Sequence, residues 1–219
     1  MMFSNPEVAA VYAEYEARVA EEREAMKAFD GPAAPGAPPV DPNRFLLPVG
    51  PEVGRFLHAL VLARRPRRIL ELGTSYGYST LFLADAARSV GATVVTMEIA
   101  DYKQAYAAQR IAAAGLSGQV EFRLGDAVAL TAADPGPFDF ALLDIWKDLY
   151  LPCFEALYPK LSDEGVIAAD NMIYPPMARG DARAYRAAVC ARPDLTSTLL
   201  PIGSGIELSV KWSAGNPSL

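Results

Sequence analysis

The sequence is poor in the side chains that hold soft metals or build nucleophilic triads. Its 219 residues contain one histidine, His58, and two cysteines, Cys153 and Cys190, too few for a cysteine- or histidine-rich zinc site. A serine–histidine–aspartate triad would have to use His58. We interpret His58 instead as a helix-surface or otherwise satisfied side chain. Any metal should therefore be a hard cation held by oxygen ligands.

The sequence also lacks long apolar runs and an excess of positive charge. No stretch reaches the ~20 apolar residues that span a bilayer, and Met1–Phe29 lacks the basic start and apolar centre of a signal peptide. Lysine plus arginine number 20 against 26 acidic residues, a net charge of -6, which argues against nucleic-acid or anionic-membrane binding. Two distant cysteines do not indicate a disulfide framework. We therefore expect a cytoplasmic protein that binds neither nucleic acid nor membrane.

What the sequence does contain is the length and apolar content of one globular domain. Its side chains are 52% hydrophobic, and domains commonly reach ~100–200 residues or somewhat more. Apolar residues at helical spacing predict a helix over 6–29, and a second helix is expected over Pro51–Arg64. The proline-rich segment 31–42 between them is typical of a loop or lid hinge, with a solvated linker as the alternative.

From residue 68 onward, short apolar runs alternate with segments of helix length. The runs that predict buried strands are Arg68–Leu72, Thr93–Glu98, Val120–Leu124, Phe138–Leu143 and Val166–Ala169. The helices expected between them cover about Tyr78–Arg88, Asp101–Ala114, Asp126–Ala132 and Tyr150–Leu161. This alternation predicts an α/β fold, a Rossmann-like doubly wound parallel sheet with helices on both faces. Leu195–Pro201 and Ile206–Trp212 predict a closing antiparallel hairpin.

A glycine-rich turn follows the first predicted strand, within Glu71–Thr80. Gly73 and Gly77 would let the backbone approach a ligand at the carboxyl end of the sheet, although tight packing alone is an alternative. The spacing is not the G-x-G-x-x-G of dinucleotide-binding proteins. The second strand ends at Glu98, where doubly wound folds hold ribose hydroxyls with a carboxylate; a solvated glutamate is the alternative. At the end of the third strand, Asp126 would contact an adenine edge.

Two further predicted strands end in acidic residues. Asp144 follows the fourth strand, and Asp170 and Asn171 follow the fifth. If these strands are neighbours, the three side chains meet at one edge of the sheet. Two carboxylates and an amide oxygen form a partial shell for Mg²⁺. The alternative is that each aspartate only caps a helix.

Lys147 lies three residues after Asp144. Next to a divalent cation and partly desolvated, its amine would have a lowered pKa and would suit a general base at neutral pH. The alternative is a surface lysine paired with Asp148 or Glu155.

Taken together, these segments resemble a known family of enzymes. They are Glu71–Thr80 (ELGTSYGYST), Met97–Ile99, Leu143–Pro152 (LDIWKDLYLP) and Ala169–Pro175 (ADNMIYP). The sequence is similar to the class I S-adenosylmethionine-dependent O-methyltransferases, most of all to catechol O-methyltransferases, with caffeoyl-CoA O-methyltransferases as close relatives. The Asp-x-x-Lys-x-x-Tyr and Asp-Asn elements carry most of this resemblance.

The resemblance implies a fold and a site. The sheet would have seven strands with an antiparallel last strand, and S-adenosylmethionine would lie in the crevice at its carboxyl edge. The implied cofactor-binding residues are Val49, Glu71, Gly73, Tyr78, Ser79, Glu98, Asp126, Ala127, Asp144 and Trp146. The implied ligands of Mg²⁺ or another divalent cation are Asp144, Asp170 and Asn171. Lys147 would be the catalytic base, and the substrate would contact Trp146, Lys147, Asn171 and Pro175.

The implied reaction moves the methyl group of S-adenosylmethionine to a hydroxyl of a small catechol-like aromatic, a vicinal diol that can chelate Mg²⁺. Residues 1–66 would supply N-terminal helices and a lid segment. Residues 67–219 would form the cofactor- and metal-binding sheet core of one methyltransferase domain, 1–219. One departure concerns the late glutamate of catechol O-methyltransferases, which has no counterpart here: Pro201 or Ile202 stands in its place.

Two other functions are left open by the sequence. An NAD-dependent oxidoreductase would use the same kind of sheet, although the G-x-G-x-x-G fingerprint is missing. A non-catalytic cofactor-binding protein would have no use for a base beside a metal shell. The natural acceptor, the regioselectivity and the oligomeric state are not determined by the sequence, and a homodimer is left open.

Overall fold

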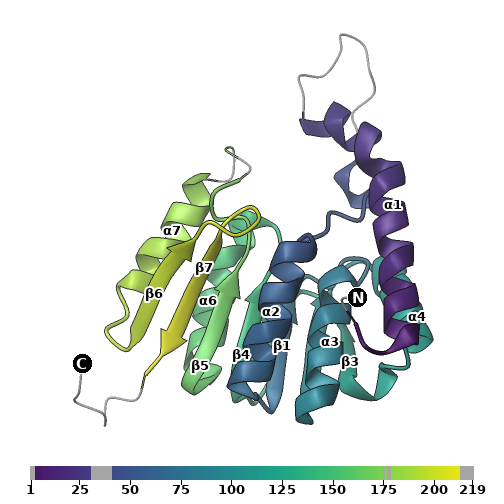
Figure 1. Ribbon diagram of the computed structural model, residues 1–219. Helices are drawn as coiled ribbons and strands as arrows, with labels where there is room; N and C mark the ends of the chain where they lie inside the picture. Colours follow the sequence, from purple (N-terminus) through teal and green to yellow (C-terminus); the bar gives the residue numbers. More distant parts are fainter. Residues whose placement is uncertain (1–2, 31–40, 175, 177–178, 213–219) are drawn as a thin grey trace.

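A computed structural model describes residues 3–30, 41–174, 176 and 179–212. Its centre is a seven-stranded sheet in the order β3-β2-β1-β4-β5-β7-β6 (Figure 1). The strands are β1 Arg68–Leu72, β2 Thr93–Glu98, β3 Val120–Leu124, β4 Phe138–Leu143, β5 Leu161–Ala169, β6 Leu195–Leu200 and β7 Ile206–Lys211. The α-helices are α1 Pro6–Asp30, α2 Pro51–Arg64, α3 Tyr78–Val90, α4 Asp101–Ala113, α5 Ala127–Ala133, α6 Tyr150–Leu157 and α7 Arg179–Cys190. Short 3-10 helices are η1 Pro42–Arg44, η2 Ser117–Gln119, η3 Lys147–Leu149 and η4 Tyr158–Lys160.

The strand directions confirm the predicted topology. Strands β1 to β5 pair in parallel, and β7 runs antiparallel to both of its neighbours, β5 and β6. The short connection between β6 and β7 forces this reversal, because two strands joined by a tight turn must run in opposite directions. The fold is therefore a Rossmann-like doubly wound sheet of seven strands with an antiparallel last strand.

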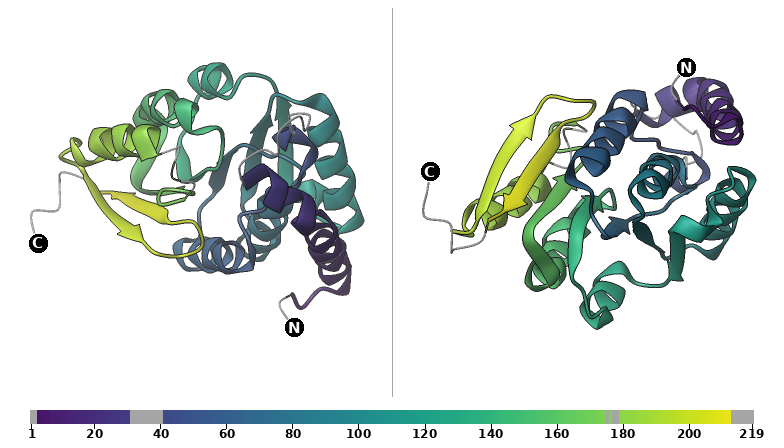
Figure 2. Two further views of the ribbon diagram at one scale, coloured as in Figure 1. Left: turned by 90° about the horizontal axis from the view of Figure 1, so that it is seen from above. Right: turned by 60° about the horizontal axis from the view of Figure 1, so that its bottom comes forward.

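Helices cover both faces of the sheet, as expected (Figure 2). On one face, α2 and α3 pack their apolar side chains on Ile69 and Val94. On the other face, residues of α5, α6 and α7 pack on Leu70 and Val95. Successive strand residues point to opposite faces, so a strand covered on both sides must be apolar throughout. This is why the parallel strands could be recognised as continuous apolar runs.

Strand β5 is longer than the predicted run Val166–Ala169, and the preceding helix is shorter than predicted. Helix α6 ends at Leu157 because the following residues tighten into the 3-10 helix η4, which contains Pro159. The outer part of β5 carries the polar sequence 162–165, with Glu164 at a positive φ of 61°. These residues resemble a turn in sequence, and they form an irregularity in the strand between Leu161 and Val166, which pair with Phe138 and Phe140 of β4.

Helix α7 was not predicted from the sequence. Its buried residues are Ala182, Tyr185 and Val189, and its exposed residues include Arg179, Asp181, Arg183 and Arg186. These three buried residues repeat at the i, i+3, i+7 spacing of one helix face, so the sequence does contain an amphipathic pattern for this helix. The helix exists because this stripe packs in the same cluster as α6 and the end of β5.

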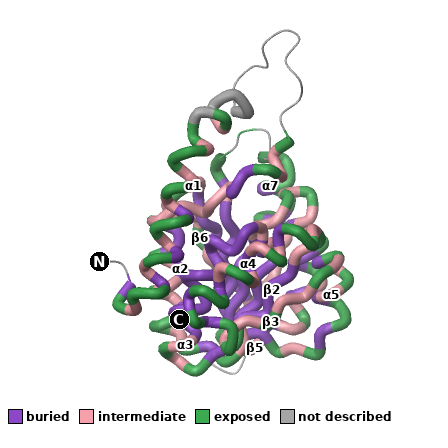
Figure 3. The backbone as a smooth tube through the Cα atoms, turned by 90° about the vertical axis from the view of Figure 1, so that its right-hand side faces the viewer, coloured by how far each residue is buried: buried purple, intermediate pink, exposed green. Residues whose placement is uncertain are grey.

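The N-terminal helix α1 packs against α3 and α4 through Val8, Val11 and Tyr15, all at most 2% exposed. Its carboxyl-terminal part extends beyond the carboxyl edge of the sheet (Figure 1), and much of it is exposed (Figure 3). Segment 31–40, most of the proline-rich region, lies outside the described residues. None of the helices in the described part is both long and apolar enough to cross a membrane.

Candidate active site

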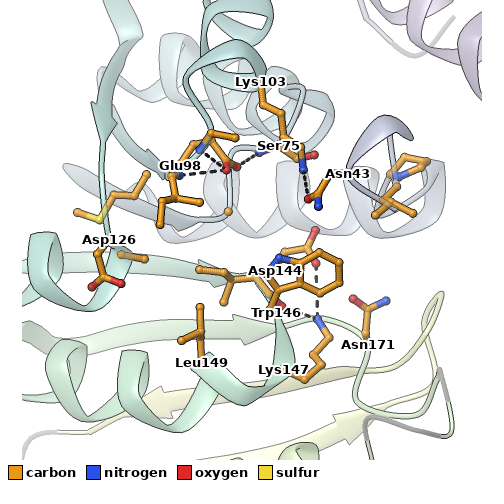
Figure 4. Close-up of a pocket in the computed structure, with 18 of the residues that line it drawn as sticks. Asn43, Ser75, Glu98, Lys103, Asp126, Asp144, Trp146, Lys147, Leu149 and Asn171 are labelled. Atoms are coloured by element: carbon orange, nitrogen blue, oxygen red, sulfur yellow. Dashed lines mark hydrogen bonds and ion pairs between the residues drawn. The ribbon is translucent and has the colours of Figure 1, made fainter. Parts of the chain in front are cut away.

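A cavity of about 390 Å³ lies at the carboxyl edge of the sheet, where the glycine turn and the acidic strand ends meet (Figure 4). The predicted site residues that line it are Gly73, Glu98, Asp126, Ala127, Asp144, Trp146, Lys147 and Asn171. Val49, Glu71, Tyr78, Ser79 and Asp170 are not among the lining residues. Pro175 lies outside the described residues. The structure thus brings most of the predicted site together around one cavity.

The turn after β1 brings the chain very close to the end of β4. Gly73 has a φ of 98°, and a Cβ added there would overlap the carbonyl oxygen of Asp144. The amide of Asp144 donates to the carbonyl of Leu72 at 3.0 Å. Only glycine fits such a contact. The sequence left open whether this glycine serves close ligand approach or tight packing. Gly73 does pack tightly against the end of β4, and it also lines the cavity.

Glu71 lies beneath this turn and is fully buried. Its carboxylate accepts hydrogen bonds from Ser79 Oγ at 2.7 Å and from Thr80 Oγ1 and Thr96 Oγ1, both at 2.6 Å. Burial raises the pKa of Glu71 to about 7, although these hydrogen bonds favour the charged form. Glu71 therefore joins β1, β2 and α3 below the cavity, a role that also occupies Ser79.

The other predicted residues outside the cavity wall have identifiable contacts. Tyr78 donates from its hydroxyl to Glu16 Oε1 at 2.7 Å, which ties α3 to α1. Val49 packs against the apolar clusters of α2 and α3. Their predicted contacts with the cofactor stay predictions.

Glu98, at the end of β2, lines the cavity with a carboxylate that backbone amides hold in place. Oε1 accepts from the amides of Ile99 and Ala100, both at 3.0 Å, and Oε2 accepts from the amide of Ser75 at 2.8 Å. The last bond crosses from the end of β2 to the glycine turn after β1. The alternative of a freely solvated glutamate is therefore wrong.

Asp126 and Ala127 line the cavity next to Glu98, where β3 leads into α5 and the amide of Gly125 donates to the Glu98 carbonyl at 2.8 Å. Asp126 is the N-cap of α5, and its Oδ1 accepts from the amide of Ala129 at 2.7 Å. This bond uses only one carboxylate oxygen of Asp126, and the side chain also lines the cavity.

Asp144 and Asp170 end the adjacent strands β4 and β5, in the predicted arrangement. Lys147 Nζ lies 3.8 Å from Asp144 Oδ1. Burial raises the pKa of Asp144, which the Lys147 ammonium opposes. Burial and the Asp144 charge raise the pKa of Asp170 to about 7. The Asp170 Oδ1 atom is buried without a hydrogen-bond partner. Asp144 does not cap the helices that follow it, whose N-cap residues are Trp146 and Leu149.

Lys147 is half-buried rather than on the surface, with a side chain 13% exposed. Its amine donates to the carbonyl of Ile145 at 3.1 Å and to the hydroxyl of Tyr150. Burial lowers the pKa of Lys147, while Asp144 and Asp170 oppose this shift. The alternative of a surface lysine is therefore wrong; Glu155, one of its suggested partners, pairs with Arg192 at 2.7 Å.

Tyr150 fixes the position of Lys147 relative to the two strand ends. The Tyr150 hydroxyl lies 2.9 Å from the carbonyl of Leu143 and 3.0 Å from that of Asp170, and it donates its proton there. It can therefore only accept from Lys147, whose Nζ is also 4.2 Å from the centre of the Tyr150 ring. One buried hydroxyl thus connects the lysine with the ends of β4 and β5.

The segment after β5 forms the open side of the cavity. Asn171 lines it with a positive φ of 54°, and the next residues bond to the β6–β7 turn, where the Ser204 carbonyl accepts from Ile173 at 2.9 Å. Ser204 also lines the cavity.

The acidic residue that follows Pro201 and Ile202 most closely in the sequence is Glu207, which is fully buried and accepts from Ser197 Oγ at 2.6 Å. It cannot replace the late glutamate, so that departure stands.

The turn 73–77 also has the G-x-S-x-G spacing of a nucleophile elbow, and Ser75 has a positive φ of 46°. A nucleophilic serine needs an adjacent base. His58 Nε2 instead lies 3.1 Å from Asp85 Oδ2, between α2 and α3, and does not line the cavity. The satisfied histidine expected from the sequence is confirmed, and Ser75 has no imidazole partner.

Besides Ser204, three polar residues of the cavity wall were missed from the sequence, namely Asn43, Ser75 and Lys103. Ser75 lies inside the recognised glycine turn, and Lys103 lies in the first turn of the helix after Glu98. Both positions could have been found by considering every side chain that follows a strand end. Asn43 had no local signal, because the chain before it returns to the cavity only through the tertiary fold.

Comparisons with known proteins agree with this geometry. A family model described as a methyltransferase domain matches residues 70–172. A catechol O-methyltransferase of Niastella koreensis is 38% identical over 130 residues, 57% of this chain and 58% of that protein, so the chain spans less than two thirds of it. Caffeoyl-CoA O-methyltransferase 1 of Eucalyptus globulus is 30% identical over 175 residues, 71% of each protein. The structure of a Bacillus cereus O-methyltransferase in complex with SAH superimposes with a TM-score of 0.66 and 28% identity, over 89% of this chain and 90% of that one.

The chain therefore belongs to the class I O-methyltransferases, the enzymes that use S-adenosylmethionine as methyl donor. The family expected from the sequence is confirmed. The membership removes the NAD-dependent oxidoreductase as an interpretation of the sheet.

Proposed function

We propose that this protein transfers the methyl group of S-adenosylmethionine to one hydroxyl of a small catechol-like aromatic, with the help of Mg²⁺ or another divalent cation. The observation that carries the proposal is the meeting of Asp144, Lys147 and Asp170 at the ends of adjacent strands. This cluster adjoins a cavity that also contains Glu98. The cavity offers room for a cofactor on one side and an acceptor on the other.

The donor set fits a hard divalent cation. Asp170 Oδ1 is buried and unpartnered, and burial together with the charge of Asp144 raises the pKa of Asp170. Asn171 supplies an amide oxygen at the cavity wall. Within the described residues, no three histidine, cysteine or acidic side chains form a metal cluster, and Mg²⁺ often keeps waters or substrate oxygens beside one or two carboxylates. Asp144, Asp170 and Asn171 would hold the cation, which when bound stabilises a phenolate oxygen.

Lys147 would accept the proton of the acceptor hydroxyl at Nζ. Two of its hydrogen-bonding positions are occupied by the Ile145 carbonyl and the Tyr150 hydroxyl, which leaves the third for the acceptor. Burial lowers the pKa of Lys147, which is the direction of shift that a general base requires. S-adenosylmethionine supplies a methyl group activated by its sulfonium.

The apolar rim of the cavity would hold the acceptor ring. Trp146 and Tyr174 line the cavity and are 51% and 47% exposed. Large exposed aromatic side chains at a cavity mouth suit a flat aromatic ligand. Orienting the reacting oxygen toward the methyl group is expected to supply much of the rate acceleration. The names of the catechol and caffeoyl-CoA relatives support the same acceptor class.

We also propose that residues 1–66 and 67–219 act as one methyltransferase domain. Tyr15 of α1 donates to the carbonyl of Tyr76 in the glycine turn at 2.7 Å. The carboxylate of Glu22 accepts from the amide of Leu46 at 2.7 Å. Met26 of α1 lines the cavity. The N-terminal part would therefore cover the cofactor side of the cavity.

The test is methyl transfer to a panel of vicinal dihydroxy aromatics and matched monohydroxy phenols, measured as release of S-adenosylhomocysteine. We expect turnover of the diols with Mg²⁺, and its loss in excess EDTA. Lys147→Ala should lower kcat on the order of 10²- to 10⁴-fold, because it removes the general base, and Asp144→Ala should cost at least as much. Undiminished turnover in EDTA would reject the metal. No transfer to any diol, despite tight cofactor binding, would favour a non-catalytic binding protein.

A further inference from the structure

The carboxylate of Glu98 has little capacity left for a ligand. A carboxylate has about four acceptor positions, two on each oxygen. The amides of Ile99 and Ala100 occupy both positions on Oε1, and the amide of Ser75 occupies one on Oε2. One position remains. A ribose presents two vicinal hydroxyls, so Glu98 can accept from one of them, and the second needs another partner.

Lys103 places a buried ammonium on the same wall of the cavity. It is the third residue of α4 and is 6% exposed. Figure 4 shows its amine beside Asn43, on the wall that carries Ser75 and Glu98. Nζ donates to Asn43 Oδ1 at 3.1 Å, and the Tyr76 ring centre lies 5.7 Å away. An ammonium has three donors, so at least one stays available to a ligand in the cavity.

Lys103 and Glu98 both line the cavity, so one ligand bound there can contact both side chains. The charge of Glu98 acts on Lys103, since it opposes the lowering of the lysine pKa by burial. Yet Lys103 forms no ion pair within 4.0 Å among the residues that the structure describes. A buried ammonium with an unused donor is costly. A ligand oxygen between the two groups would satisfy both.

We propose that Lys103 binds the ribose hydroxyl of the cofactor that Glu98 cannot bind. One hydroxyl donates to the remaining position on Glu98 Oε2, and the oxygen of its vicinal neighbour accepts from Lys103 Nζ. The pair thereby recognises a cis-diol, with an acceptor for one hydroxyl and a donor for the other. This assignment rests on the proposed function, because it requires the adenosine of the cofactor to lie beside Glu98.

The alternative role of Lys103 is purely structural. Through Asn43 it connects α4 with η1, the segment that returns to the cavity before α2. In that case the loss of Lys103 would weaken every ligand of the cavity equally, whether or not it has both ribose hydroxyls.

Calorimetric binding of S-adenosylhomocysteine and its 2′-deoxy and 3′-deoxy analogues separates the two roles. In the wild-type protein we expect each deoxy analogue to bind about 10-fold or more weaker than the parent, since each loses a hydrogen bond to a charged group. In Lys103→Met the parent should weaken by a similar factor. One of the two analogues should then bind as tightly as the parent, because its missing hydroxyl no longer has a partner. Lys103→Gln serves as the second variant if the methionine variant does not fold.

Two controls complete the experiment. Lys147→Met removes the other ammonium that lines the cavity and should leave both deoxy penalties unchanged. Asn43→Ala breaks the link to η1 and should also keep both penalties. Retention of both penalties in Lys103→Met, or their loss in Asn43→Ala, would overturn the assignment. If the wild-type protein fails to bind S-adenosylhomocysteine, the proposed function is contradicted and this assignment falls with it.

Discussion

Four carboxylates at strand ends share one edge of the sheet, and their hydrogen-bond partners give them different roles. Glu71 is enclosed by three hydroxyls, and Glu98 is held by three backbone amides. Asp170 has a buried oxygen with no partner, and Asp144 faces Lys147. The sequence predicted that all four lie near the site. The number of partners, which only the structure shows, separates residues that stabilise the fold from those able to take a ligand.

At this scale we predict that Tyr150→Phe lowers kcat about 10- to 100-fold while the KM for S-adenosylmethionine stays within about 2-fold. The variant removes the only described hydroxyl that accepts from Lys147, so the amine is no longer oriented, and small misplacements of this kind are costly. Steady-state kinetics of methyl transfer measures both constants. The matched control is Tyr158→Phe, whose hydroxyl bonds to Asp194 away from the cavity and whose loss should leave kcat unchanged. Equal kcat values for wild type and Tyr150→Phe would refute the positioning role.

At the scale of elements, the turn between β1 and α3 determines how closely β1 and β4 approach each other. The parallel strands and the first six α-helices were predicted because their apolar runs and periodicities are local properties of the sequence. The outer part of β5 was missed because residues 162–165 are polar, and Leu161 joins the sheet only by pairing with Phe138 of β4. Helix α7 was missed although Ala182, Tyr185 and Val189 repeat at helical spacing, because most of its other side chains are charged or small. Tertiary contacts commonly override local preference in this way.

For this turn we predict that Gly73→Ala destabilises the protein far more than Gly91→Ala. Both glycines have a positive φ, 98° and 75°, but a Cβ at Gly91 meets nothing within 4 Å, whereas one at Gly73 overlaps the Asp144 backbone. The control should cost only the left-handed conformation, about 1–2 kcal/mol. The Gly73 variant should cost at least ~2 kcal/mol more, because the β1–β4 contact must open. Urea denaturation of both variants measures the difference, and equal losses would contradict the close contact.

At the scale of the whole molecule, the stability of the domain should depend on the protonation of groups buried beneath its site. Glu71 has its pKa raised from 4.5 to about 7 by burial. The folded state therefore holds a proton that the unfolded state releases between these values. Its contribution to stability is complete below about pH 4.5 and is lost as the pH rises through about 7.

We accordingly predict that the free energy of unfolding of the wild-type protein falls more steeply between pH 5 and pH 8 than that of Glu71→Gln. The shift corresponds to a difference on the order of 3 kcal/mol over the whole range. Glutamine carries no titrating proton, while other buried acids such as Asp170 titrate in both proteins and cancel in the comparison. Urea denaturation of the cofactor-free proteins across this range gives the two slopes. Parallel pH profiles would show that Glu71 is already ionised in the folded state at pH 5.

By itself, the sequence determined the class of fold, the family and the approximate edge at which the site lies. Strand and helix periodicities are written in neighbouring residues, and polar side chains that follow parallel strands must gather at one edge. The tertiary structure decided which of those side chains are free to bind. Glu71 and Glu98 are both strand-end glutamates, but contacts with α3 and the glycine turn bury one and orient the other. Lys103 and Asn43 join the cavity only because α4 and η1 meet across it, a contact between residues 60 positions apart that no local pattern encodes.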